Sequence, residues 1–305
     1  RIEVAPGDEL GQLASAFNHM ATRLQHSLRE IEYQNERLRH GLTLARDIQQ
    51  GLLPSAPPWG VDLLRVYGRS LPASEVGGDF YTYLNLSDGR VAIAIGDISG
   101  KGVAAALLMA LTSSTLESQA RLLANPSEML QAMHLALRQR LQANQMNAAV
   151  LIAVFDPEGR SVTIANAGMI APLLLQCRGD GQGQCRFLDV GGLPIGTRIN
   201  GLYRDVSVEL APGETLLFLS DGIVEAHNAE GELFGFERLE QLVKTFTPGM
   251  DVQEIVQRII RAVLIFAGSA EPHDDVTIIA VRLPLRPSTA SAGAPATPYA
   301  TGTDV

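Results

Sequence analysis

The chain has 305 residues and a formal net charge of −9, and 46% of its residues are hydrophobic. The acidic balance argues against a general nucleic-acid-binding protein, which usually carries a basic excess. No apolar run approaches the roughly 20 residues that a membrane span needs. The apolar content is enough for one large domain with attached segments. Because the sequence opens on Arg1 rather than on Met, we expect a fragment of a longer protein with room for a membrane segment upstream.

The first fifty residues have the apolar spacing of a long helix. From Leu10 to Leu24 the apolar positions alternate in steps of three and four, which is the spacing of a coiled-coil seam. Asn35 fills a seam position, where a polar residue fixes register and partner number at a cost in stability. Because the seam continues to Leu38 and beyond, we predict a dimeric coiled coil. The alternative is a single amphipathic helix folded onto its own domain. Three prolines in 51–60 end the helix.

The remainder of the chain alternates strand and helix signals. Alternating apolar runs separated by short turns predict strands at 79–86, 90–97, 148–156, 161–168, 205–210, 215–221 and 276–283. Helical spacing predicts helices at about 102–122, 127–143, 236–246 and 251–267. Adjacent hairpins form antiparallel sheets, and the helices need a surface on which to bury their apolar faces. We therefore predict an α+β fold in which two packed antiparallel sheets are flanked by helices and preceded by the long coiled-coil helix.

Aspartates flank several of these strands, most of them beside glycine. Asp79 and Asp97 each lie nine residues from Asp88, at the centre of a hairpin turn, so antiparallel pairing brings them opposite each other. Asp221 ends one apolar strand, and the pair Asp274–Asp275 begins another. If those two strands run antiparallel, the end of one and the start of the other share an edge. The sequence therefore predicts that all five carboxylates converge on one rim.

Several carboxylates at a semi-buried rim cannot all stay ionised without cations. Ligand sets made only of oxygen select hard divalent ions such as Mg²⁺ or Mn²⁺. Two such ions about 3.5–4 Å apart activate water and hold a phosphate group. Any one aspartate at a strand end is more often a turn former. The five together favour a two-metal hydrolytic site.

Four motifs carry a family resemblance. In chain order, "EVGGDFY", "GDISGKGVAAALLMA", "FLSDGIVEA" and "HDDVTIIAVR" resemble the SpoIIE/RsbU branch of the metal-dependent serine/threonine protein phosphatases, the type 2C or PPM superfamily, over roughly residues 45–283. "ARDIQQGLLP" resembles the helix that precedes the catalytic domain in this branch, and "GDELGQLASAFNHMATRL" resembles the second helix of a HAMP signalling module. We therefore expect a partial HAMP module, a signalling linker helix, a phosphatase domain and a disordered tail rich in Pro, Ala, Ser and Thr, at 1–25, 26–53, 54–284 and 285–305.

The resemblance also implies roles for individual residues. It implies catalytic roles for Asp79, Asp97, Asp221 and Asp274. Asp97 would bridge two or more Mn²⁺ or Mg²⁺ ions, and Asp79 would hold metal-bound waters or a further ion. The implied metal set is these four aspartates with the backbone carbonyl of Ile98 and with Asp275, which stands where the wider family has Asn.

The chain departs from its relatives at two places, and one nearby histidine has several possible roles. Eukaryotic relatives place an arginine just before the first acidic motif, where this chain reads "LPASEVGGD". Lys101 is a candidate substitute for that arginine, although a solvated turn lysine is the simpler interpretation. Met169 replaces a histidine that the branch often has, and we expect it to pack in the core. His273 either binds metal, protonates a leaving group or simply begins a strand, and we favour the last of these.

The resemblance implies a function. It implies metal-dependent hydrolysis of phosphoserine or phosphothreonine on a partner protein, an anti-sigma-factor antagonist of the STAS type, and no nucleic-acid partner. The chain would be the cytoplasmic portion of a membrane-anchored bacterial sensor and would form a homodimer through its N-terminal helix. An upstream signal would pass through "ARDIQQGLLP" to the helix that follows Gly102. The alternative is a pseudo-phosphatase that binds phosphoprotein without turnover.

Overall fold

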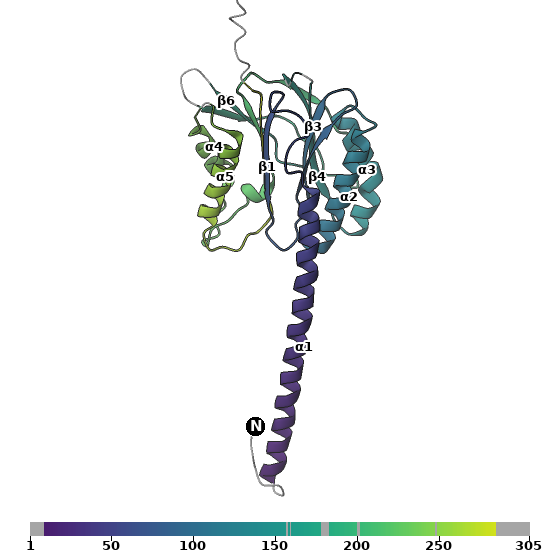
Figure 1. Cartoon of the computed structure of the whole chain (residues 1–305), viewed down its shortest axis with the longest axis vertical. Helices are drawn as coiled ribbons and strands as arrows, with labels where there is room; N and C mark the ends of the chain where they lie inside the picture. The colour runs from purple at the N-terminus through teal and green to yellow at the C-terminus, as the bar shows by residue number, and fades with distance from the viewer. Residues whose placement is uncertain are drawn as a thin grey trace, which may run out of the picture.

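A long helix projects from a layered body in the computed structural model (Figure 1), which describes residues 9–156, 158, 160–177, 183–199, 202–247 and 249–284. This helix, α1 (Glu9–Leu52), has 44 residues and confirms the predicted N-terminal helix. At about 1.5 Å per residue it is about 66 Å long. None of the helices in the described ranges is both long and apolar enough to cross a membrane. The tail predicted to be disordered, 285–305, lies outside the described residues.

The body contains two sheets, and all strand pairs between the described elements are antiparallel. The first sheet has the order β2-β3-β4-β5-β8, with bounds Phe80–Asn85, Val91–Ile98, Ala148–Phe155, Ser161–Ala167 and Val206–Glu209. The second has the order β1-β10-β9-β6-β7, with bounds Arg65–Leu71, Val276–Arg282, Thr215–Leu219, Leu173–Cys177 and Gly183–Phe187.

Helices cover the outer faces of both sheets (Figure 1). The first sheet carries α2 (Val103–Ala120) and α3 (Pro126–Ala143), and the second carries α4 (Gly235–Lys244) and α5 (Val252–Ala267). Strand β3 shows how the layers arise from the sequence, because its side chains alternate between the two faces of the sheet. Ile93 and Ile95 pack between the sheets, whereas Ala92 and Ala94 pack toward α2 and α3. The predicted layered α+β fold is confirmed.

Every strand and helix expected from the sequence is present, with ends shifted by a few residues. Three observed strands were not predicted, namely β1, β6 and β7. Strand β1 carries a glycine at its centre and two arginines, which is not an apolar alternation. The glycine has a packing reason, because a Cβ on Gly68 would lie 2.4 Å from the hydroxyl oxygen of Tyr83. The tyrosines of β2 therefore need a strand without a side chain at this point.

Candidate metal centre

The first edge of the site is the open end of the β2–β3 hairpin. Phe80 pairs with Gly96, so Asp79, one residue before β2, lies opposite Asp97 in β3. This is the juxtaposition predicted by counting from the turn. Asp79 is buried, and Asp97 is half-buried. The charge of the Asp97 carboxylate raises the pKa of Asp79, so the two carboxylates interact electrostatically.

The second edge is formed by the end of β9 and the start of β10. Ile278 pairs with Leu219 in an antiparallel ladder, and continuing this register places Asp221 opposite Val276, directly after Asp275. Asp221 begins a short 3₁₀ helix, Asp221–Ile223, at this point. A Cβ on Gly222 would lie 2.0 Å from the backbone carbonyl oxygen of Asp275. The close approach of the β10 backbone therefore requires glycine after Asp221.

The two edges meet because Asp275 reaches from one sheet to the other. Its Oδ2 accepts the N–H groups of Gly78 at 2.7 Å and of Asp79 at 3.3 Å, and its Oδ1 accepts the N–H of Ala73 at 2.7 Å. The residue is only 5% exposed. The backbone of the loop before β2 therefore wraps around this carboxylate, which brings Asp79 beside the start of β10.

Crowded negative charge dominates the electrostatics of the rim. Burial, and then the carboxylates of Asp221, Asp274 and Asp275, raise the pKa of Asp97 to about 7. Burial, and then the charges of Asp97 and Asp275, hold the pKa of Asp79 well above its ordinary value. Burial, and then Asp274 and Glu225, also raise the pKa of Asp221. Such a group of acids favours either bound protons or bound cations.

Three observations fit a cation at this rim. The Oδ2 atom of Asp79 is buried and has no hydrogen-bond partner among the residues that the structure describes. A Cβ on Gly78 would lie 2.6 Å from the carbonyl oxygen of Ile98 and 3.1 Å from Oδ1 of Asp97, so the glycine leaves a gap lined by oxygen atoms. The donor set consists of carboxylate and carbonyl oxygens, which suit Mg²⁺ or Mn²⁺. The residues present therefore fit the ions implied by the family resemblance.

The rim is not a closed coordination sphere made of side chains alone. Within the described ranges, no three His, Cys, Asp or Glu side chains are grouped so that they would hold an ion by themselves. Mg²⁺ usually keeps several waters and takes only one or two carboxylates from a protein. An open rim with a nearby backbone carbonyl is compatible with that mode of binding.

The last turns of α1 also contact the rim. The side-chain amide of Gln49 donates from Nε2 to the carbonyl oxygen of Gly77 at 2.6 Å, and its Oε1 accepts the N–H of Gly77 at 3.0 Å. Gly77 is two residues from Asp79. The motif "ARDIQQGLLP" contains Gln49, but periodicity did not identify this contact. The side chain of Gln49 binds backbone atoms of a residue 28 positions away, and such atoms leave no pattern in the sequence.

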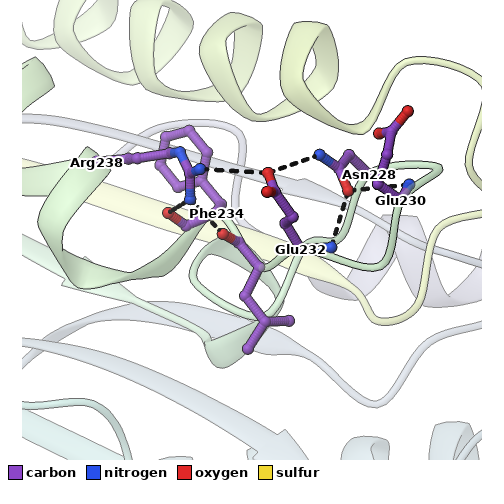
Figure 2. A network of polar contacts seen from close by, with 6 residues as sticks. Asn228, Glu230, Glu232, Phe234 and Arg238 are labelled. Atoms are coloured by element: carbon purple, nitrogen blue, oxygen red, sulfur yellow. Dashed lines mark hydrogen bonds and ion pairs between the residues drawn. The ribbon is translucent and has the colours of Figure 1, made fainter.

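The segment that follows Asp221 is stiffened by polar contacts (Figure 2). Oδ1 of Asn228 accepts the N–H of Glu232 at 2.8 Å, and Nδ2 of Asn228 donates to Oε2 of Glu232 at 3.2 Å. Arg238 donates to the carbonyl oxygens of Leu233 at 2.6 Å and of Phe234 at 3.3 Å. The network ties the turn 228–232 to the segment that leads into α4.

The remaining sequence candidates lie around the rim. Lys101 donates its Nζ to the carbonyl oxygen of His273. The ring of His273 lies 5.4 Å from that of His227, centroid to centroid, a neighbour that sequence reasoning did not identify. Met169 is buried between the sheets, as predicted, and its backbone bonds to the amide of Asn166.

The comparisons with known proteins agree with this geometry. The family described as Stage II sporulation protein E (SpoIIE) matches residues 87–284. The chain belongs to the SpoIIE family. The HAMP domain family matches residues 1–26. The fold of this SpoIIE-family chain is similar to that of the SiaA PP2C domain of Pseudomonas aeruginosa, with a TM-score of 0.70, 26% identity and coverage of 81% of this chain and 98% of that one.

Two curated proteins are similar over most of this SpoIIE-family chain. Protein IcfG of Synechocystis is 28% identical over 90% of the chain, which spans 46% of that relative's length. Phosphoserine phosphatase RsbU of Bacillus subtilis is 27% identical over 86% of the chain and 75% of its own length. The same fold occurs in the PP2C phosphatase domain of SpoIIE from Bacillus subtilis, solved with a fragment of its regulatory domain. The TM-score is 0.59 at 23% identity, and the match covers 72% of this chain and 63% of that one.

Proposed function

We propose that this chain hydrolyses phosphoserine or phosphothreonine esters on a partner protein, with two or more Mn²⁺ or Mg²⁺ ions at the aspartate rim. One observation carries the proposal: aspartates from both sheets converge beside an oxygen-lined gap in a SpoIIE-family domain. A relative over most of the chain is named a phosphoserine phosphatase.

Each residue of the rim has a proposed task. Asp97 interacts electrostatically with both Asp221 and Asp274, so it is best placed to be shared between ions. The carbonyl oxygen of Ile98 would be a further ligand, and the buried Oδ2 of Asp79 would hold metal-bound waters. When bound, the ions supply an activated water and neutralise charge on the phosphoryl oxygens. The stretch directly before Asp79, "LPASEVGGD", contains no arginine, so the phosphate depends mainly on the ions for binding.

Asp275 has a different task within this proposal. The family resemblance implies a place for it in the metal set, but three backbone N–H groups occupy most of the roughly four acceptor positions of its carboxylate. Its proposed role is to position the loop 73–79, and through it Asp79. It therefore acts as a positioning residue next to the ligands.

The substrate and the setting follow from the relatives. An anti-sigma-factor antagonist of the STAS type is the proposed phosphoprotein, because the family resemblance implies this class of partner and RsbU is a named relative. The chain is proposed to be the cytoplasmic output of a membrane-anchored sensor, because the HAMP family matches its start.

The helix α1 is proposed to form a homodimer and to transmit the signal. Its seam is exposed along its length, with large apolar side chains at Leu13, Phe17, Met20, Leu24, Leu28, Ile31 and Leu38. A second copy of the same helix would bury this stripe in coiled-coil fashion. At its other end α1 contacts α2, as predicted, and it also holds Gly77 through Gln49. A shift of α1 would therefore move the loop that carries Asp79.

Removal of residues 1–44 tests this regulatory role. The truncated protein should become monomeric and should change its Mn²⁺ affinity or its turnover. A truncated protein that stays dimeric and keeps the kinetics of the full chain would contradict the role proposed for α1.

The catalytic proposal is tested with p-nitrophenyl phosphate and Mn²⁺. The chain should turn over this substrate only with the metal, and Asp97→Ala should abolish the reaction. Metal binding without turnover in the unaltered chain would favour a pseudo-phosphatase that holds phosphoprotein. Near-normal turnover by Asp97→Ala would refute the site.

A further inference from the structure

A groove lies between β1, an edge strand of the second sheet, and the helix α5, which packs against that strand. Figure 1 shows α5 on the outer side of this sheet. Its volume is about 380 Å³. Its walls are Arg69 from β1 and five residues of α5: Gln257, Ile260, Arg261, Leu264 and Ile265. Leu264 is 55% exposed and Ile265 is 73% exposed, so one end of the groove is an open apolar surface.

The groove is cationic in a chain whose net charge is −9. Arg69 and Arg261 come from different elements, and both are exposed. In the described part of the chain neither guanidinium forms an ion pair with a carboxylate. On the same helix Glu254 is paired with Arg258 at 2.7 Å, so that acid is already occupied. The two free guanidiniums give the groove a local charge that complements an acidic ligand.

The groove opens beside the aspartate rim. Leu71 pairs with Val276, the residue after Asp275, and Arg69 pairs with Ile278. A strand rises about 3.3 Å per residue, so Ile278, the partner of Arg69, lies about 10 Å along the chain from Asp275. Ile278 packs under α4 and α5, so Arg69, its partner across the ladder, lies on the face that α5 covers. A protein whose phosphorylated side chain occupies the rim would extend over this groove.

We propose that this groove docks an acidic segment of the phosphoprotein substrate, with carboxylates on Arg69 and Arg261 and an apolar side chain against Leu264 and Ile265. The inference rests on the phosphatase function proposed above and names the chemistry of its partner. Guanidinium groups bind carboxylates through paired, charge-assisted hydrogen bonds. A contact about 10 Å along the strand from Asp275 adds affinity for a protein or peptide but none for a small phosphoester.

Synthetic phosphoserine peptides serve as the probe. One peptide carries aspartates and a leucine about three to six residues from the phosphoserine on both sides, because three extended residues span about 10 Å. The matched peptide has asparagine in place of each aspartate. The unaltered chain with Mn²⁺ should hydrolyse the acidic peptide with a kcat/KM at least about tenfold higher than the neutral one, mainly through KM.

The double variant Arg69→Glu/Arg261→Glu should lose this preference while p-nitrophenyl phosphate turnover stays within about twofold. Arg186→Glu, on β7 at the far edge of the same sheet, is the matched control and should keep the preference. Both altered arginines are exposed, so the thermal midpoint should not change. An equal kcat/KM for the two peptides in the unaltered chain, or an unchanged preference in the double variant, would overturn the inference.

A failure of the catalytic proposal is recognised separately. If the unaltered chain turns over neither peptide nor p-nitrophenyl phosphate, the fluorescently labelled acidic peptide is titrated instead. Tighter binding of the acidic peptide than of the neutral one, lost in the double variant, supports the groove without catalysis. Equal binding of both peptides would overturn it.

Discussion

Asp275 accepts the backbone N–H of Gly78 at 2.7 Å, although 197 residues separate the two in sequence. The same carboxylate holds Ala73 and Asp79 by their N–H groups. One side chain at the start of β10 therefore sets the path of the loop that leads into β2. This relationship explains how aspartates from two sheets come to share one rim.

Replacement of Asp275 tests whether it positions the loop or binds an ion. Asp275→Asn keeps one acceptor and should weaken the apparent Mn²⁺ affinity by about tenfold, while turnover at saturating Mn²⁺ remains. Asp275→Ala leaves buried N–H groups unpaired and should lower the free energy of unfolding by about 1–3 kcal/mol. Amide hydrogen exchange at Gly78 and Asp79 should accelerate in both variants. Loss of all turnover by Asp275→Asn at saturating Mn²⁺, with slow exchange preserved, would show that Asp275 is a ligand instead.

Gln49 offers a test of coupling between α1 and the rim. Gln49→Glu keeps the oxygen that accepts the N–H of Gly77. It replaces the side-chain NH₂ group, which donates to the Gly77 carbonyl oxygen, by a second carboxylate oxygen that repels this carbonyl. We expect a weaker apparent Mn²⁺ affinity, measured by calorimetry, with α1 still helical by circular dichroism. Gln25→Glu, exposed on the same helix and about 36 Å further from the rim at about 1.5 Å per residue, is the matched control. Identical Mn²⁺ titrations for Gln49→Glu and the unaltered chain would exclude this contact as a link to the metal.

The metal-free protein should lose stability as the pH rises. The pKa of Asp97 is raised to about 7, so the folded state keeps a proton that the unfolded chain releases near pH 4. The stabilising effect of this proton is complete below about pH 4 and is lost as the pH passes the folded pKa of about 7. Asp79 and Asp221, whose pKa values are also raised, act in the same direction.

Thermal unfolding in chelator at about pH 5.5 and about pH 8 measures this effect. The midpoint should be lower at the higher pH, and Asp97→Asn should reduce the difference. Mn²⁺ competes with the same protons, so its affinity should increase over this range. A thermal midpoint of the metal-free protein that rises with pH would contradict this prediction. So would a pH dependence that Asp97→Asn leaves unchanged.

The gap at Gly78 should be intolerant of even one methyl group. A Cβ there would meet the carbonyl oxygen of Ile98 at 2.6 Å, which forces the ligand backbone to move. Gly78→Ala should therefore reduce Mn²⁺ affinity by at least about tenfold in calorimetry. Gly60→Ala, where an added Cβ would meet nothing within 4 Å, should bind Mn²⁺ as the unaltered chain does. Equal affinity for the two alanine variants would remove the carbonyl of Ile98 from the proposed ligand set.

The sequence was most informative where local pattern and tertiary structure agree. Counting from Asp88 predicted that Asp79 and Asp97 face each other, because a tight hairpin fixes its own register. Strand β1 was missed because its alternation is broken by Gly68, whose role depends on tyrosines from the other sheet. The contacts of Asp275 with the loop 73–79 were also missed. Their donors are backbone N–H groups, which no residue pattern marks.

The central claim is that the rim binds a pair of divalent ions, and Mn²⁺ calorimetry on the chelator-stripped full chain at about pH 8 tests it most directly. The account predicts at least two bound ions per chain, and the loss of at least one in Asp97→Asn with the fold intact by circular dichroism. Absence of Mn²⁺ binding in the unaltered chain, or the same number of ions in Asp97→Asn, would contradict it.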